Sequence, residues 1–326
     1  MLCPDNKKVW ARKKIVEMKT ADKTIKPKAI KEKFKDDFDI VVDKALIKNA
    51  LFDAKKFPQC DNRGFGRLSG FLKALAENNE GTTTSVSTSD GVFQRAFLCP
   101  GMCSRAFGQT TKIAGLDACH IKARYGVVLV LTILDGNGGI FPVAVGIAEG
   151  ENTETWFWFL CLVKTALHID DEGDGLVFLS DREKGIDTAL KWVFPRAAHG
   201  YCVFHMIKNV TSQFHVSMEG LFYKAARVGT AKEFEEVIAE MKLIDQDAGT
   251  YIEKMPWMRW ARAFFPLRRL GHVTSNIAES MNHWLDEARR KDPVGLFSTF
   301  IRQLNNLFEK RRNNFSPRGN TSKKGL

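Results

Sequence analysis

The chain has 326 residues, of which 44% are hydrophobic and 27% charged, and it carries a net charge of +11. A chain of this length and composition can bury a sizeable core, which excludes a disordered or fibrous protein. It has no apolar run of about 18 residues and no apolar stretch behind its first lysines, so we expect neither a membrane protein nor a secreted one.

The charge is distributed unevenly along the chain. Residues 1–60 carry +7 and residues 251–326 carry +9, whereas residues 101–200 carry −3. Lysine and arginine bind the phosphates of nucleic acids by releasing counterions, and carboxylates bind the metal ions that act on phosphates. We therefore predict that the basic ends hold a nucleic acid. Basic termini that are merely solvated are the alternative.

We expect residues 1–90 to form a basic, mostly helical region. Residues 28–35 and 43–56 carry apolar residues at helical spacing and could form a small, lysine-rich unit like a helix-turn-helix. A further short helix is expected to begin at Phe71. Residues 80–90 (EGTTTSVSTSD) are polar and predict a loop that ends this region.

From residue 112 the pattern favours strands. Two long apolar runs flank the glycine-rich turn Asp135–Gly139 (DGNGG), which is typical of an antiparallel hairpin. An amphipathic helix follows, with Asn152 or Thr153 as its N-cap. Strands and helices then alternate, which predicts an α/β fold with a mixed five-stranded sheet flanked by helices over residues 91–210. The expected strands cover residues 112–116, 126–134, 140–148, 175–179 and 201–204, and the expected helices cover residues 152–167 and 184–193.

The rest of the chain is predicted to be helical. The spacing of apolar residues indicates helices over residues 219–244, 251–265, 274–290 and 296–311. No internal repeat interrupts this order.

Two aspartates end predicted strands. Asp117 follows Gly115-Leu116, and Asp181 follows Leu179-Ser180. If the strands are neighbours, the carboxylates come close together, and carboxylate oxygens are the ligands that Mg²⁺ and Mn²⁺ prefer. Two ions about 4 Å apart can activate a water on one side of a phosphodiester and stabilise the leaving oxygen on the other. The pair therefore suggests phosphodiester cleavage, although an aspartate after a strand is also a common turn residue.

Longer sequence blocks carry a family resemblance. In chain order they are Gly91-Val92-Phe93, the run from Gly115 to Leu160 that begins GLDACHIKARYG, FLSDREKGI from Phe178, FPRAAHGYCVFHMIKN from Phe194, and TSNIAESMN from Thr274. With these blocks, residues from about 68 to 290 resemble the transposase domain of Mutator-like elements (MULEs), a group of DDE transposases.

The resemblance implies an RNase H-like core whose catalytic triad consists of Asp117, Asp181 and Glu279 and holds two Mg²⁺ (or Mn²⁺) ions. The third acid is reached after a helical insertion over residues 211–265, and residues 266–326 form C-terminal helices that complete the core and a basic tail. The residues alone do not select the third acid. The competing glutamates are Glu183, which could add a ligand from the loop of Asp181, Glu219 and Glu253.

The family also carries a Cys-x-x-His element after the second acid, and Cys202 and His205 stand at that position as an accessory motif. A buried thiol and a packed histidine would explain the two residues equally simply. Basic clusters near the end of the chain are candidates for binding phosphates, with solvated helix faces as the alternative. These candidates are Arg268, Arg269, Lys310, Arg311 and Arg312.

The function that follows is that of a MULE-type DNA transposase, which cuts and joins DNA phosphodiesters by a two-metal mechanism. Its partners would be the element ends and the target DNA, and bringing two ends together implies a homo-oligomer. We expect it in the nucleus, with residues 289–291 and 310–312 as possible import signals. The alternative is a domesticated or truncated transposase-derived protein that binds DNA and regulates transcription without catalysis.

Overall fold

The structure is a computed structural model. It describes residues 10–11, 14–15, 17–19, 21–22, 24–38, 40–56, 62–89, 92–122, 126–135, 138–182, 184–267, 280–281 and 283–315. Three predicted site residues, Glu279, Arg268 and Arg269, and the competing Glu183 lie outside these ranges. Within the described ranges, no helix has both the length and the apolar character needed to cross a membrane.

A mixed sheet forms the centre of the molecule, with the strand order β1-β2-β5-β4-β3-β6-β7. Neighbouring strands are antiparallel from β1 to β3, whereas β3, β6 and β7 run parallel to one another. The predicted α/β class is confirmed, but the sheet has seven strands rather than five. The strands are β1 Thr83–Ser89, β2 Val92–Cys99, β3 Ile113–His120, β4 Val127–Leu134, β5 Ile140–Ala148, β6 Val177–Ser180 and β7 Ala198–Tyr201.

Several elements differ from the sequence-based expectation. The helix expected over residues 219–244 is divided into Glu219–Arg227 and Ala231–Ile244, and residues 251–265 hold only the end of the helix Gln246–Glu253 and the 3-10 helix Trp257–Arg259. Most of the helix expected over residues 274–290 lies outside the described ranges.

Residues 80–90 are not a loop throughout, because residues 83–89 form β1 and pair with β2 along its length. The threonines and Val86 favour extended backbone through their β-branched side chains, and a polar strand is suited to the edge of a sheet. The last strand, β7, ends at Tyr201, and the apolar residues from Val203 onward begin a helix instead.

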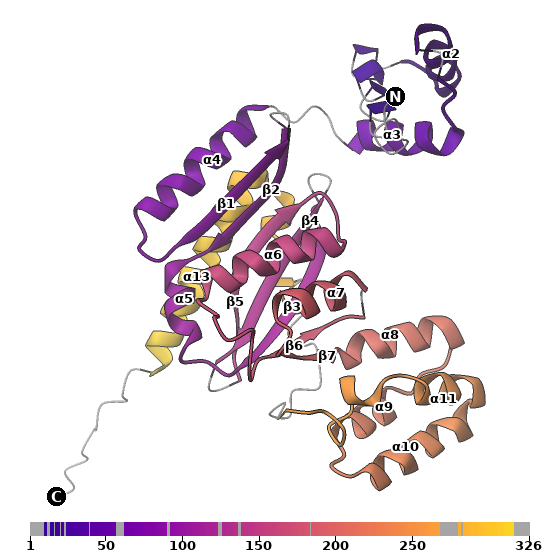
Figure 1. The fold of residues 1–326 in the computed structure, drawn as a ribbon, viewed down its shortest axis with the longest axis vertical. Helices are drawn as coiled ribbons and strands as arrows, with labels where there is room; N and C mark the ends of the chain where they lie inside the picture. The colour runs from indigo at the N-terminus through magenta and orange to yellow at the C-terminus, as the bar shows by residue number, and fades with distance from the viewer. Residues whose placement is uncertain are drawn as a thin grey trace, which may run out of the picture.

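The main apolar core lies on both faces of this sheet. All eight residues of β4 are buried, because the strand has a neighbour on each side and helices above and below. In Figure 1, α6 and α7 lie in front of the sheet and α13 passes behind it. Leu68 and Leu72 of α4 join the same core. The helices around the sheet are α4 Asn62–Glu77, α5 Gly101–Phe107, α6 Thr153–Ala166, α7 Lys184–Val193 and α13 Pro293–Phe315, with the short 3-10 helix η2 Ala288–Arg290 before α13.

A helical insertion follows β7 and has an apolar core of its own. Phe222, Phe234 and Trp260 are fully buried in it and their rings contact one another. A capping box formed by Thr230 and Glu233 begins α10. The elements are α8 Val203–Phe214, α9 Glu219–Arg227, α10 Ala231–Ile244, α11 Gln246–Glu253 and the 3-10 helix η1 Trp257–Arg259.

The N-terminal helices form a third apolar cluster. Helix α2 (Pro27–Phe38) and helix α3 (Lys44–Lys56) bury Ile30, Phe34 and Ile47 against Ile15 from the segment before them. Figure 1 shows this unit apart from the sheet. Helices were expected here over nearly the same residues, because Ile30 and Phe34 lie one turn apart.

Candidate active site

The two predicted aspartates lie side by side on neighbouring parallel strands. Strands β3 and β6 are paired in a register that places Gly115 opposite Leu179. Continuing this register by two residues places Asp117 opposite Asp181, and adjacent strands are about 4.8 Å apart. The sheet therefore brings together two carboxylates that are distant in the sequence.

The sequence suggested that Asp117 ends its strand, but Asp117 lies inside the strand. Strand β3 continues to His120 because it pairs with β4 over its whole length, whereas its pairing with β6 stops at Gly115. Asp117 thus stands where the parallel half of the sheet ends. Asp181 is the first residue after β6.

The environment of Asp117 disfavours its ionised form. Burial is the main cause that raises the pKa of Asp117 to about 7, and the negative charges of Asp181 and Glu151 raise it further. The N–H of Ala118 and the charge of Arg289 act in the opposite direction but are weaker. A divalent cation between these carboxylates would supply positive charge that favours their ionised forms, and their oxygens are donors of the kind that such an ion prefers.

Two further residues belong to this site that the sequence did not indicate. Glu151 lies just before α6, and its carboxylate accepts a hydrogen bond of 3.2 Å from Nε1 of the buried Trp156. Arg289 of η2 donates to the carbonyl of His120 at the end of β3. Both are brought to Asp117 by packing between distant segments. The only signal for Glu151 in the sequence is its place between a strand and a helix N-cap.

An ion-pair cluster fixes the segment of Arg289 to the end of β3. Asp286 contacts Lys122 just after β3, and also Arg289 and Arg290. The hydrogen bonds from Lys122 and Arg290 hold the pKa of Asp286 below its usual range. The backbone N–H of Lys122 donates to the carbonyl of Arg289 at 2.9 Å. In addition, Glu287 pairs with Lys291, so residues 289–291 are all engaged in ion pairs within the chain.

The Cys-x-x-His element begins helix α8. Cys202 is the N-cap, and its Sγ accepts the backbone N–H of His205 at 3.4 Å. Burial lowers the pKa of His205, while the nearby charge of Asp181 counteracts this effect. The Nδ1 atom of His205 is buried and has no hydrogen-bond partner in the described part of the chain. The motif therefore places an imidazole beside the second aspartate.

The other candidate residues are only partly described. Among the described residues, no group of three His, Cys, Asp or Glu side chains could hold a metal ion by itself. The competing Glu253 is paired with Lys242 inside the insertion. Arg311 pairs with Asp135 of the hairpin turn at 2.9 Å. Lys310 and Arg312 are exposed.

Comparison with known proteins places a family domain over the same residues. The model of the MULE transposase domain matches residues 113–209, which run from β3 into α8 and include both aspartates and the Cys-x-x-His element. The chain is also similar to Protein FAR1-RELATED SEQUENCE 4 of Arabidopsis thaliana, with 23% identity over 202 residues. The similarity covers 59% of this chain and 26% of that protein, so the chain spans about a quarter of the length of this relative.

Proposed function

We propose that the protein is a MULE-type DNA transposase, which cuts and joins DNA phosphodiesters. The observation that carries the proposal is the proximity of Asp117 on β3 and Asp181 just after the parallel neighbour β6, inside the segment that matches the MULE transposase domain. Glu279 is proposed as the third acid of the triad, supplied by the segment that leads to η2.

The strand arrangement supports an RNase H-like core for this site. Strands β3, β4 and β5 are antiparallel neighbours, α6 follows them, and β6 and β7 then add in parallel beside β3. The first acid lies on β3 and the second follows β6, so both reach the same edge of the sheet. The hairpin of β1 and β2 extends this sheet on the far side of β5.

The proposed residues perform defined tasks. Asp117, Asp181 and Glu279 would hold two Mg²⁺ or Mn²⁺ ions, which, when bound, activate the attacking oxygen and stabilise the leaving one. Because the pKa of Asp117 is about 7, Asp117 must release a proton before it can act as a ligand at neutral pH. His205 is close enough to Asp181 to respond to its charge, and we propose that it contacts the DNA phosphate that the metal ions bind.

The partners follow from this chemistry and are proposals of the same kind. DNA would be bound as element ends and as target, by a homo-oligomer that brings two ends together, in the nucleus. Lys310 and Arg312 remain candidates for phosphate contacts because both side chains are exposed. Arg311 has its guanidinium on Asp135 and on the carbonyl of Ile140, which holds α13 on the hairpin.

Nicking and joining of a labelled DNA duplex in Mg²⁺ or Mn²⁺ tests the proposal. We expect Asp117→Asn, Asp181→Asn and Glu279→Gln each to lower the cleavage rate by about 10³-fold, because each removes a charged metal ligand. Binding of DNA should persist in all three variants. Asp174→Asn is the matched control, since Asp174 is exposed and its one ion pair with a described residue is that with Arg196.

Metal-dependent cutting that survives Asp117→Asn or Asp181→Asn would contradict the assignment of these residues. If the wild-type protein binds DNA tightly and cuts it in neither metal, the alternative of a transposase-derived DNA-binding regulator replaces the proposal.

A further inference from the structure

We propose that Arg259, which the helical insertion supplies, is a positioning residue for the strand end that carries Asp181. The proposal deepens the proposed function, because it gives the insertion a role at the acid pair. Its structural half, that Arg259 immobilises the end of β6, can be tested without any catalysis.

The insertion touches the sheet at β7 through a close backbone approach. A Cβ atom on Gly200 would lie 2.8 Å from Leu179 Cδ2 and 3.3 Å from the carbonyl oxygen of Arg259, so a side chain there would press on η1. Two nitrogens of the Arg259 guanidinium donate hydrogen bonds to residues of the sheet and of α7. Nη1 donates to the carbonyl of His199 at 3.0 Å, and Nη2 donates to Asp187 Oδ1 at 3.0 Å. This two-point contact requires the planar fork of an arginine.

A buried chain of hydrogen bonds continues from Arg259 to Asp181. Oδ1 of Asp187, which accepts from Arg259, lies 3.2 Å from His199 Nδ1, and His199 Nε2 lies 2.8 Å from Ser180 Oγ. Ser180 Oγ in turn lies 2.7 Å from the carbonyl oxygen of Asp181. The chain thus runs from the insertion to the backbone of the second aspartate.

The position of the protons in this chain depends on Asp187. Burial lowers the pKa of His199 to about 4, so the imidazole is neutral at neutral pH and has a single N–H. Asp187 is ionised, which assigns that N–H to Nδ1. Nε2 is then an acceptor, and the one hydroxyl proton of Ser180 is shared between Nε2 and the Asp181 carbonyl. Lys191 holds Oδ2 of Asp187 at 2.6 Å, and Arg259 holds Oδ1, the oxygen that faces His199. Arg259 therefore positions the oxygen that fixes the tautomer of His199.

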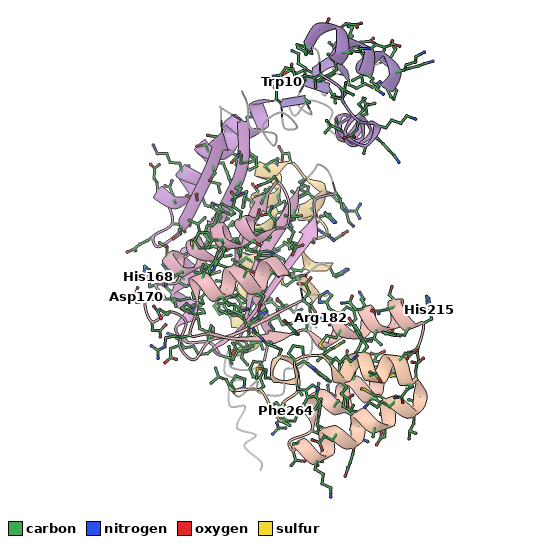
Figure 2. The ribbon with its side chains drawn as sticks, turned by 45° about the vertical axis from the view of Figure 1, so that its right-hand side comes forward. Trp10, His168, Asp170, Arg182, His215 and Phe264 are labelled. Carbon is green, nitrogen blue, oxygen red and sulfur yellow. The ribbon has the colours of Figure 1, made fainter. Side chains whose placement is uncertain are left out.

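The same strand end is held from its other side by the insertion. Arg182, directly after Asp181, donates from Nη2 to the hydroxyl of Tyr251 on α11 at 3.0 Å, and its guanidinium lies 5.9 Å from the centre of that ring. Figure 2 shows Arg182 between the sheet and the insertion helices. Insertion residues therefore contact Arg182 directly and reach Ser180 through Asp187 and His199.

The order Ser180, His199 and Asp187 also matches the hydrogen-bond sequence of a nucleophilic triad. Ser180 is only 2% exposed, and its Oγ lies against the Asp181 carbonyl. An attacking hydroxyl needs access to a substrate, so the arrangement serves position and not nucleophilic attack.

The test compares the full-length chain with three variants and a control. Arg259→Met removes the fork, Arg259→Lys keeps the charge but only one donor position, and Ser180→Ala interrupts the chain at its far end. Arg262→Met is the control, because it removes the same charge from the same segment at an exposed side chain with no contact to the chain of hydrogen bonds. Mn²⁺ binding is measured by calorimetry, and hydrogen–deuterium exchange follows a peptide covering residues 179–182.

We expect Arg259→Met and Ser180→Ala to weaken Mn²⁺ binding by about tenfold, because loss of a residue that orients a metal ligand has an effect of this size. Both variants should also show faster hydrogen–deuterium exchange at the end of β6. Arg259→Lys should recover part of both effects, and Arg262→Met should match the wild type. Wild-type exchange and affinity in Arg259→Met and Ser180→Ala would overturn the proposal. If the wild type binds no Mn²⁺, the proposed function fails, and the exchange rates alone decide whether Arg259 positions the strand end.

Discussion

The carboxyl of Asp117 makes the stability of the folded protein depend on pH. Its pKa rises from 3.8 to about 7 on folding, so the folded protein keeps this proton in a pH range where the unfolded chain has lost it. Stability from this group is therefore complete below about pH 4 and is lost as the pH rises through 7.

We expect Asp117→Asn to be more stable than the wild type at pH 8 in the presence of a chelator. The difference should approach about 4 kcal/mol at pH 8 and vanish near pH 4, because each pKa unit of the shift corresponds to about 1.4 kcal/mol. Urea unfolding at pH 4.5, 6 and 8 measures it. An equal pH dependence for both proteins would show that Asp117 is ionised in the folded state as in water.

The sequence indicated Asp117 and Asp181 because each follows an apolar run, which is a local signal. It could not indicate Glu151 or Arg289. Their place beside Asp117 depends on how α6 and η2 pack against the sheet, and no spacing in the chain encodes that contact. The sequence could not indicate His199 either, because its partners Ser180 and Asp187 come together only in the folded parallel sheet.

At the scale of elements, helices α6 and α7 meet at their first turns. Gly185 lies so close to α6 that a Cβ would be 2.9 Å from the Thr153 nitrogen and 3.0 Å from the Asn152 carbonyl carbon. Both neighbours are backbone atoms at the N-cap of α6, so neither can move without disturbing the helix. Both helices begin beside the acid pair, after Glu151 and Asp181.

We expect Gly185→Ala to destabilise the protein by about 2 kcal/mol through overpacking, and to lower the cleavage rate because the two helices are pushed apart. Gly220→Ala is the control. Gly220 lies in α9 with nothing within 4 Å of an added Cβ, so alanine there should stabilise the protein by up to about 1 kcal/mol. Urea unfolding of both variants provides the measurement. Equal stability of Gly185→Ala and wild type would contradict the close approach of the two helices.

Elements with one dominant pattern were predicted well, and those with mixed signals were not. The apolar run of β4 is rich in β-branched residues and is bounded by glycines, which favours a buried strand. The serines and threonines of β1 have both turn and strand character, and their pairing with β2 determined the outcome. A strand was predicted over residues 201–204, where α8 in fact begins at Val203. The run Tyr201-Cys202-Val203-Phe204 is apolar throughout, which does not distinguish a strand from a helix.

At the scale of the whole molecule, the two basic ends differ in how their charge is used. Lysines of α2 are exposed and form no ion pair with another described residue, for example Lys28, Lys31 and Lys35. Around η2 and α13 the cations are paired with Asp286 and Glu287, as for Arg290 and Arg302. A cation that already has a carboxylate partner gains less from a phosphate, because the existing pair must be broken.

We therefore expect the N-terminal lysines to contribute more to DNA binding than the C-terminal cluster. Replacing Lys28, Lys31 and Lys35 together by glutamine should reduce the slope of log affinity against log salt by about 2 to 3, since each phosphate contact adds about 0.9. The matched triple replacement at the C-terminal cluster should change the slope by less than about 1. Titrations of a DNA duplex at several salt concentrations measure both slopes, and the reverse order would contradict the argument. The C-terminal triple is Arg290, Lys291 and Arg302, each changed to glutamine.

The insertion also covers an edge of the sheet. Strand β7 is the last in the strand order, and its Ala198 N–H points inward to β6, so the next residue, His199, directs its carbonyl outward. The guanidinium of Arg259 donates a hydrogen bond to that carbonyl. An open strand edge is a template on which a second chain can add, and such addition leads to aggregation. Deleting the insertion would therefore leave a protein that self-associates through β7, and the helices of this region also preserve solubility.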